Sequence, residues 1–420
     1  MQLAEHFFRR EAGRLVVALT RIFGVHNLAL AEDVAQDAFC RAIEVWKTRG
    51  IPENPSAWLM ATAKNRALDR VRRERTARTF APELARHLES EWTLAPTIDE
   101  AFQPAVIRDE QLRMMFSCCH PKLPEEAQLA LILNILCGFG APEIAAAFLT
   151  GRAAIEKRIS RGKKALAGTK SLFDLADADF GARLTTVQRA LYLLFNEGYH
   201  GASAAAPVRA ELCEEAMRLV ALLSEHPPGA TPATHALAAL MCLHAARLPT
   251  KLDAAGELSV MGEQDRSRWD AQRVAEGLAL LERSARGDEL TPYHIEAAIA
   301  AEHASAPSFA ATNWRVISSL YDKLMTIAPS PVVALNRAIA LAECDGVERG
   351  LEALGAIDDR ERLAEYPFYR AAFGELELRR GNGAAAATHF RAALHVARSE
   401  PERRFLEKRI ATASRPRERR

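Results

Sequence analysis

Hydrophobic residues recur with the period of an α-helix along nearly the whole chain, and this pattern limits the fold more than any other feature. Alanine and leucine are abundant, aromatic residues make up only 7% of the chain, and no run of alternating β-branched residues predicts a strand. The 420 residues, 49% of them hydrophobic, can build two to four domains with sizeable cores. We therefore predict an all-α protein.

The composition excludes several other classes of protein. A content of 26% charged residues is typical of a globular chain and not of a disordered or fibrous one. No apolar run reaches the roughly 18 residues that a membrane span needs, and residues 1–6 do not resemble a signal peptide. Seven scattered cysteines fit reduced thiols, so we expect a cytoplasmic protein.

The net charge of +1 conceals a separation of charge along the chain. Residues 1–170 carry 25 basic and 20 acidic side chains, whereas residues 171–420 carry 30 and 34. Two basic segments, 64–78 and 152–170, have net charges of +5 and +6, and residues 79–110 between them have −5. One basic segment alone is as easily a solvated helix face, but two that each end an apolar-periodic helix favour contact with phosphate groups.

Residues 1–78 are predicted to form three helices. In the second, Val34, Ala38 and Ile43 are expected to face a core. The third starts at an Asn-Pro-Ser sequence and continues through Trp58 into the first basic segment. Its cations therefore lie near the helix C-terminus, where they also suit the helix dipole.

A helix-turn-helix is predicted in residues 111–170. The short helix PEIAAAF is followed by the turn LTG, which ends at Gly151, and by a longer basic helix from Ala153 to Ala167. Many helical hairpins share this pattern, but a basic second helix is what a DNA-recognition helix requires. Residues 79–110, with several proline and polar breaks, are predicted to be an acidic linker.

Together these segments resemble a bacterial alternative sigma factor of the extracytoplasmic-function type, in the sigma-70 family. The resemblance is carried by AEDVAQDAFCRAIEVW, NPSAWLMATAKNRALDRVRRER and LPEEAQLALILNILCGFGAPEIAAAFLTGRAAIEKRISRGKKAL. It implies a sigma region 2 domain in residues 1–78 and a sigma region 4 domain in residues 111–170. It also implies binding to core RNA polymerase and to the −10 and −35 elements of promoter DNA.

The resemblance further implies roles for individual residues. The clamp helices of the polymerase β′ subunit would be bound by Asp33, Gln36, Asp37 and Phe39. The −10 element would be melted and held by Trp58, Lys64, Asn65, Arg66, Asp69, Arg70, Arg72 and Arg73. The −35 element would be read by Arg152, Glu156, Lys157, Arg158, Arg161, Lys163 and Lys164. Region 4 would also contact the β flap of the polymerase.

The turn of the helix-turn-helix departs from the common family pattern at two positions. Gly151 stands where Ser or Thr often occurs, and Ala154 stands where Thr is common. Glycine can serve as an N-cap, but a hydroxyl contact to phosphate would be missing. The sequence therefore leaves open which residues of the second helix contact which DNA positions, but it still predicts a helix-turn-helix.

Sigma factors of this type usually end near residue 170, so residues 171–420 need their own interpretation. A repeat of about 34 residues predicts tetratricopeptide-like helix pairs in residues 291–412, with Gly374 and Phe390 at a small and an aromatic position of the last repeat. A generic helical bundle is the alternative interpretation of this stretch. Residues 171–290 are predicted to form a helical middle domain.

The middle domain contains three unusual sequences, LYLLFNEGYHGA, ALMCLHAARLP and EQDRSRWD. They resemble a group of sigma factors that carry a tetratricopeptide-like C-terminal extension. This group commonly lacks a dedicated membrane anti-sigma factor and is associated with small DGPF/YCII-like proteins. The resemblance implies that the extension regulates the sigma module through a regulatory protein or ligand, with no membrane partner.

No catalytic constellation is predicted. Cys118, Cys119 and His120 have no CxxC partner, and adjacent cysteines rarely form a structural zinc site, so buried thiols are expected. Glu197 and His200 lack a second carboxylate or a nucleophile motif and are expected at a helix end. An ion network that fixes helix packing is predicted for Glu263, Asp265, Arg266, Arg268 and Asp270.

We therefore predict a protein that is not an enzyme and that needs no metal or cofactor. Two alternatives stay open. One is a tetratricopeptide-type adaptor with a DNA-binding helix-turn-helix but no sigma activity. The other is a helical enzyme that uses the cysteine and histidine groups or the glutamate and histidine pair.

Overall fold

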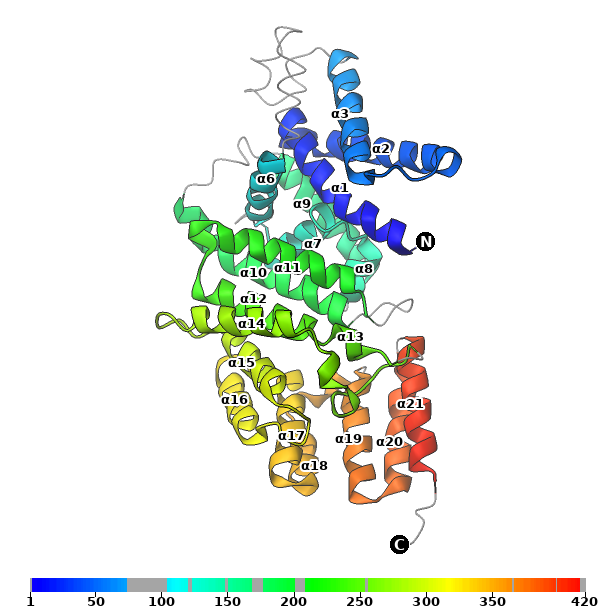
Figure 1. Cartoon of the computed structure of the whole chain (residues 1–420), viewed down its shortest axis with the longest axis vertical. Coiled ribbons are helices and arrows are strands. Elements are labelled where there is room, and N and C mark those ends of the chain that lie inside the picture. The colour runs from blue at the N-terminus through cyan, green and yellow to red at the C-terminus, as the bar shows by residue number, and fades with distance from the viewer. Residues whose placement is uncertain are drawn as a thin grey trace. The chain divides into compact units, whose positions relative to one another are not determined.

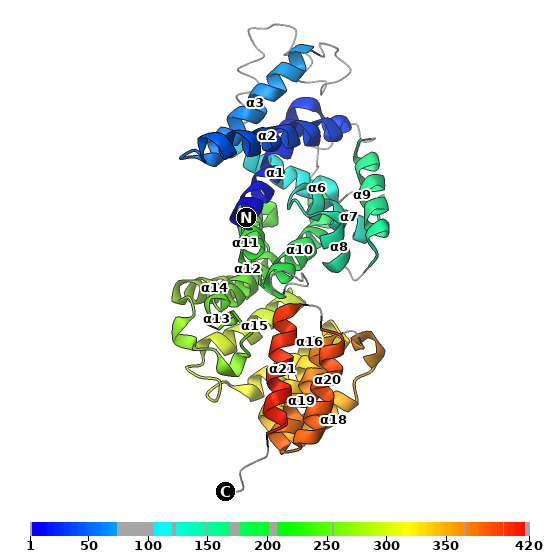
Figure 2. The same cartoon turned by 90° about the vertical axis from the view of Figure 1, so that its right-hand side faces the viewer.

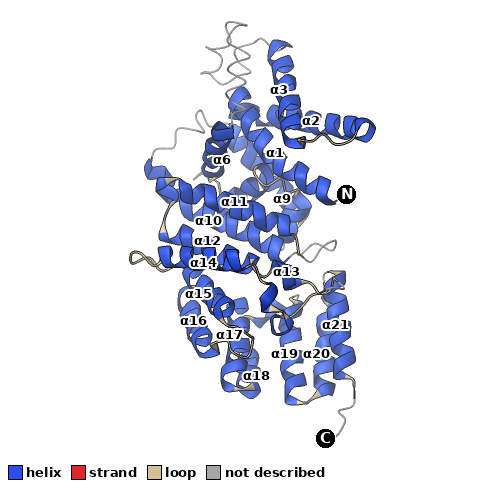
Figure 3. Ribbon diagram, in the orientation of Figure 1, coloured by secondary structure: helices blue, strands red, loops and turns tan. Residues whose placement is uncertain are grey.

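The computed structural model describes residues 2–73, 104–119, 123–147, 150–167, 177–200, 208–253, 256–364, 366–397 and 399–415. Within these ranges the chain folds into helices joined by turns, and Figure 3 shows no strand among them. The described residues contain one isolated β-bridge, between Leu252 and Leu258. The prediction of an all-α protein is confirmed.

The chain divides into two compact units, whose helices are labelled in Figure 1. The first unit comprises Met1–Leu194 and Glu225–Gly229, and the second comprises Phe195–Ser224 and Ala230–Arg420. The boundary falls within a single helix, α10 (Asp177–His200). The first unit therefore continues past residue 170, where the helix-turn-helix domain is predicted to end.

Three helices form the N-terminal part of the first unit: α1 (Gln2–Phe23), α2 (Leu28–Arg49) and α3 (Pro55–Arg73). Small residues of α2 let these helices pack closely, and Ala35, Ala38 and Ala42 are at most 2% exposed. The sequence pattern also places Ile43 toward this core, but its side chain is 44% exposed. Position 43 follows the buried Ala42 by one residue, and a rotation of about 100° per residue turns it out of the core.

Four further helices follow: α6 (Pro104–Cys118), α7 (Glu125–Ile135), α8 (Ala141–Ala147) and α9 (Arg152–Ala167). Helix α6 begins inside residues 79–110, which the sequence predicts to be a linker. Helix α7 is buried on nearly every side, as its apolar sequence predicts. Gly162 of α9 lets the two helices approach, since a Cβ atom there would lie 2.6 Å from Leu131 Cδ1.

The second unit begins with a group of packed helices whose bounds are α11 (Ala210–Glu225), α12 (Pro232–Ala245), α13 (Leu248–Lys251), α14 (Ala271–Ser284), α15 (Pro292–Ser305) and α16 (Trp314–Ile327). Helix α12 lies at the centre and packs against both α14 and α15. Its start is fixed by Thr231, whose hydroxyl accepts a hydrogen bond from the Thr234 amide, and by Pro232 in the first turn.

The rest of the second unit consists of helices that pack as neighbours along the chain (Figure 2). Their bounds are α17 (Pro331–Asp345), α18 (Val347–Gly355), α19 (Pro367–Arg380), α20 (Gly383–His395) and α21 (Glu400–Ala413). Gly374 and Phe390 meet between α19 and α20, where a Cβ atom on Gly374 would lie 2.7 Å from the Phe390 ring. This small-against-aromatic packing is what the tetratricopeptide-like pattern predicts.

Candidate nucleic-acid interface

Helix α3 has one buried face and one charged face. Leu59, Ala63 and Ala67 are completely buried and recur at helical spacing. The opposite face exposes four of the residues predicted to bind the −10 element, namely Asn65, Arg66, Asp69 and Arg70. This separation of faces leaves amide and guanidinium groups in solvent, ready for bases and phosphates.

The other predicted −10 residues lie at the ends of this face. Trp58 is half-buried near the start of α3, and its ring packs edge-on against Trp46 with 5.6 Å between centroids. Lys64 is half-buried. Arg72 and Arg73 lie in the last turn of α3, and their side chains are outside the described part of the structure.

Helix α2 presents an exposed stripe that contains three of the predicted polymerase-binding residues. Asp33, Gln36 and Asp37 are exposed, and the fourth, Phe39, is half-buried. Ile43 continues this stripe at helical spacing, since it lies seven residues, or about two turns, after Gln36. A surface that combines carboxylates, an amide and an exposed branched apolar side chain suits a protein partner.

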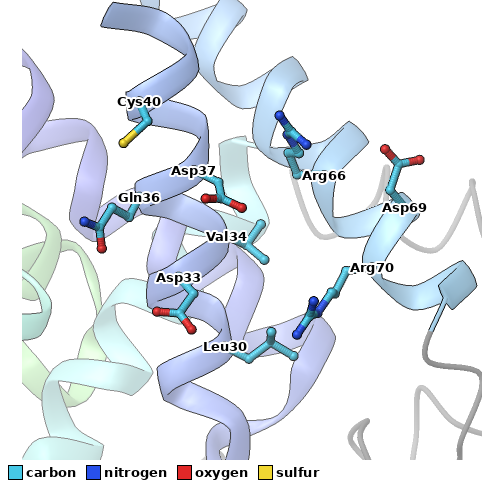
Figure 4. A pocket seen from close by; sticks show the side chains of 9 residues that line it. All are labelled: Leu30, Asp33, Val34, Gln36, Asp37, Cys40, Arg66, Asp69 and Arg70. Atoms are coloured by element: carbon cyan, nitrogen blue, oxygen red, sulfur yellow. The ribbon is translucent and has the colours of Figure 1, made fainter.

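An open pocket of about 380 Å³ lies between the exposed faces of α2 and α3 (Figure 4). Helix α2 lines it with Asp33 and Asp37, and α3 lines it with Arg66 and Arg70. Asp37 lies on the side of α2 that faces α3 in Figure 4. Among the described side chains, no carboxylate lies within ion-pair distance of Arg66, although Asp37 and Asp69 line the same pocket.

The helix-turn-helix is formed by α8 and α9, as predicted. Ile155, Ile159, Gly162 and Leu166 are the buried residues of α9 and recur every three or four positions. The Thr150 amide donates to the Ala145 carbonyl and closes the end of α8. The seven predicted −35 residues lie on the remaining surface of α9.

These seven residues divide according to their ion pairs. Three are exposed cations without a carboxylate partner among the described residues, and they are Lys157, Arg161 and Lys164. Their spacing of four and three residues places them along one face of α9. That face lies opposite the buried stripe.

The other four predicted −35 residues are engaged in ion pairs. Arg152 Nε lies 2.7 Å from Glu156 Oε1 within α9. Arg158 Nη2 lies 2.5 Å from Glu126 Oε2 of α7, and Lys163 Nζ lies 2.5 Å from Glu32 Oε1 of α2. Sequence reasoning missed Glu32 and Glu126, because nothing local marks a carboxylate whose partner is far along the chain.

The turn before α9 has room for a larger side chain. A Cβ atom on Gly151 would meet nothing within 4 Å. The carbonyl oxygen of Gly151 already accepts hydrogen bonds from the Ala154 and Ile155 amides. A Ser or Thr side chain would therefore fit at position 151, and lack of space does not explain the glycine there.

The cysteine pair lies in the core, as expected. Cys118 is completely buried and Cys119 is 2% exposed, and burial raises the pKa of the Cys119 thiol to about 12. Such thiols stay protonated and are poor metal ligands or nucleophiles. His120 lies outside the described residues, within which no group of three or more metal-ligating side chains occurs.

Glu197 and His200 lie at the end of α10, where the sequence predicts them. Glu197 is buried in the last turn, and His200 is the last residue of the helix. No described helix is long and apolar enough to cross a membrane.

A helical domain with an exposed charged face, followed by a helix-turn-helix whose second helix carries cations without a carboxylate partner among the described residues, is typical of a DNA-binding transcription factor. Residues 7–77 match sigma-70 region 2, and residues 113–166 match sigma-70 region 4. Residues 183–285 match a family of unknown function, DUF6596. An uncharacterized protein of Rhizobium meliloti (strain 1021) is 38% identical over 392 residues, which cover 93% of this chain and 90% of the relative.

The chain belongs to the sigma-70 family, as an extracytoplasmic-function-like sigma factor with a long C-terminal extension. Its domains are those of an alternative sigma factor, which binds core RNA polymerase and promoter DNA and directs promoter-specific transcription. The sequence-based identification of the family is confirmed.

Proposed function

We propose that α9 reads the −35 element chiefly through Lys157, Arg161 and Lys164. The observation that carries this proposal is that these three exposed cations share one face of α9 and lack carboxylate partners among the described residues. Unpaired cations can bind phosphates and base edges without first breaking an ion pair. Arg152, Glu156, Arg158 and Lys163 would join the interface by exchanging their present ion pairs for contacts with DNA.

The −10 element is assigned in this proposal to the exposed face of α3. Asn65, Arg66, Asp69 and Arg70 lie there together, and Trp58 and Lys64 lie beside them. Holding a melted strand requires cations for its phosphates and polar or aromatic groups for its unstacked bases. Arg72 and Arg73 extend the same helix by one turn and are assigned to phosphate contacts.

The polymerase is assigned to the stripe on α2. Asp33, Gln36, Asp37 and Phe39 would dock on the clamp helices of the β′ subunit, and the exposed Ile43 adds apolar area to the same stripe. Region 4 would dock on the β flap. The pocket between α2 and α3 would then lie where the polymerase surface and the −10 surface adjoin.

The extension is proposed to regulate the sigma module through α10. The first part of this helix belongs to the first unit, where Arg183 Nη1 donates to the Phe116 carbonyl at 3.1 Å and Arg189 Nη1 pairs with Glu125 Oε1 at 2.7 Å. The end of the same helix belongs to the second unit. A change at that end can therefore be transmitted along one continuous helix to α6 and α7.

The test of the proposed function is promoter-dependent transcription in vitro with purified core polymerase. We expect transcripts with the full chain and a loss of at least tenfold for Arg161→Ala at subsaturating protein. Arg349→Ala, an exposed arginine of α18, is the matched control and should keep full activity. Equal activity of both variants would contradict the assignment of the −35 contacts to α9. If the chain does not bind core polymerase, the alternative of a tetratricopeptide-type adaptor without sigma activity is favoured.

Two truncations test the role of α10. A chain that ends after Leu194 keeps the Arg183 and Arg189 contacts, whereas a chain that ends after Lys170 loses both. We expect the longer truncation to be the more stable and to read the same promoter as the full chain. A changed −10 or −35 preference in the longer truncation would contradict the assignment of DNA reading to the first unit.

A further inference from the structure

A cluster of basic and aromatic side chains lies in the second unit, which contains neither sigma region. It is built from the three unusual sequences of the middle domain together with α13 and α15, and we name it the basic-aromatic cluster. Its members are Tyr199, His244, Arg247, Lys251, Arg266, Trp269 and His303. They come from the end of α10, the end of α12, α13, the turn before α14, and α15 (Figure 1).

Three cations of the cluster are held against aromatic rings. Lys251 Nζ lies 3.4 Å from the ring centroid of Tyr199 and donates a hydrogen bond to the Tyr199 carbonyl at 2.5 Å. The guanidinium carbons of Arg247 and Arg266 lie 5.4 Å and 5.1 Å from the ring centroid of Trp269. Rings stabilise cations, but they do not neutralise them.

The partners of these cations are neutral. Arg247 donates from Nε and Nη2 to Gln264 Oε1, each at 3.3 Å. Arg266 donates to the carbonyls of His303 and Ala306 and to the hydroxyl of Thr312. Among the described residues, no carboxylate lies within ion-pair distance of Arg247, Lys251 or Arg266.

The acidic residues of EQDRSRWD do not supply the missing charge. Asp265 accepts from Ser267, and Asp270 caps α14 and pairs with Arg273. Glu263 lies 3.5 Å from Arg409. The prediction of an ion network among Glu263, Asp265, Arg266, Arg268 and Asp270 is therefore wrong. The carboxylates cap helices or pair with arginines outside this set, and Arg266 donates to backbone carbonyls instead.

Several buried polar atoms of the cluster lack a hydrogen-bond partner in the described structure. They are Tyr199 Oη, Trp269 Nε1, Arg266 Nε, and Nδ1 of His244 and of His303. Tyr199, Trp269 and His303 are only 2%, 7% and 8% exposed. The indole and guanidinium nitrogens can only donate, and the phenol can donate, so the cluster has donors and positive charge in excess of acceptors.

The pKa values of two basic groups in the cluster are lowered, as expected where neighbouring cations have no carboxylate to balance them. Burial holds the pKa of Lys251 well below its usual value, and neighbouring Arg247 lowers it further. Burial also lowers the pKa of His303 to about 3, with Arg247 and Arg266 as further causes. Arg247, Lys251 and Arg266 are half-buried and have no carboxylate partner among the described residues, and cations in such a setting favour an anionic ligand.

We propose that the basic-aromatic cluster binds a small oxyanion, a phosphate or carboxylate group, between Arg247, Lys251 and the unpaired donors of Tyr199 and Trp269. An oxyanion supplies the two properties that the cluster lacks, negative charge and several acceptor atoms. Arg266, which is already bonded to three acceptors, positions Trp269 and α15. Binding is a property of the second unit alone, whereas its effect on transcription rests on the regulatory role proposed above.

The test is thermal unfolding of the full chain in sodium phosphate, sodium acetate and sodium chloride at equal ionic strength. The proposal expects phosphate or acetate to raise the melting temperature above chloride in a saturable way. At a concentration of about 100 times Kd, the ratio of folded to unfolded protein rises roughly a hundredfold. The anion that gives the saturable rise identifies the phosphate or the carboxylate source.

Variants show whether the rise in melting temperature comes from anion binding at the cluster, from binding elsewhere or from a general effect of salt. Arg247→Gln and Lys251→Met should abolish the rise, whereas the exposed Arg283→Gln should keep it. Arg161→Ala should also keep it, which excludes binding to α9 as its cause. An equal rise in wild type and cluster variants would be a general salt effect on folding and would overturn the proposal.

A second measurement applies where a cluster variant fails to fold. Isothermal titration calorimetry of the wild-type chain with each anion measures binding to the site directly. A weak site has a Kd in about the mM range, so each anion is added up to about a 50-fold molar excess over the protein. If neither anion then gives a saturable heat of binding, the proposal is overturned.

Discussion

Lys163 of the recognition helix is paired with Glu32 of α2, with 2.5 Å between Nζ and Oε1. One residue is assigned to DNA, and the other lies on the helix that is assigned to the polymerase. Both side chains are about a third exposed, at 27% and 30%. Glu32 of region 2 would therefore compete with DNA for Lys163 of region 4, because Lys163 cannot bind Glu32 and a phosphate equally well at once.

Removing the carboxylate should strengthen DNA binding. We expect Glu32→Gln to raise the affinity of the full chain for a −35 duplex by up to about fivefold, since partly exposed ion pairs contribute about 0–1 kcal/mol. Fluorescence anisotropy measures this change. Glu352→Gln, which breaks the exposed pair with Arg349 in α18, is the control and should leave the affinity unchanged.

The salt dependence of DNA binding should report the unpaired cations of α9. Each phosphate contact adds about 0.9 to the slope of log affinity against log salt. We expect Lys164→Gln to reduce that slope by about 1 without changing which sequence is preferred. The exposed Lys323→Gln of α16 should keep the wild-type slope. An unchanged slope for Lys164→Gln would remove this residue from the interface.

Two glycines of the second unit should respond in opposite ways to the same substitution. A Cβ atom on Gly374 would lie 2.7 Å from the Phe390 ring, so Gly374→Ala should destabilise the unit by about 1–3 kcal/mol. A Cβ atom on Gly355 would meet nothing within 4 Å, so Gly355→Ala should be neutral or stabilising by up to about 1 kcal/mol. Urea unfolding measures both, and equal effects would argue against the α19 and α20 packing.

Acid should destabilise the second unit through His303. Its folded-state pKa is about 3, below the unfolded value of 6.5, so the unfolded chain binds more protons between these values. The free energy of unfolding should therefore fall as pH drops from 6.5 toward 3, by at most about 1.4 kcal/mol per pH unit from this group. His303→Gln should make the dependence shallower but not remove it, because burial also holds the pKa of the neighbouring His244 well below its usual value. The exposed His395→Gln should not, and equal slopes would show that His303 is not the acid-sensitive group.

Helices, the helix-turn-helix and the small-against-aromatic pairs could all be predicted from sequence. They depend on local periodicity, and the buried stripe of Ile155, Ile159 and Leu166 is visible in the residue spacing itself. Ile43 shows where periodicity fails, because one residue of error in register moves a side chain from the core to the surface.

Helical periodicity, motifs and charge spacing along the chain are enough to predict the all-α class, the sigma family and the separation of charge that marks two basic helices. They cannot determine which charges are free. Arg158 and Lys163 look equivalent to Arg161 and Lys164 in the sequence, yet folding brings Glu126 and Glu32 to the first two only. Likewise the acidic residues around Arg266 are near in sequence but turned elsewhere in space. Electrostatic interaction depends on distance and burial, and only the tertiary structure sets these.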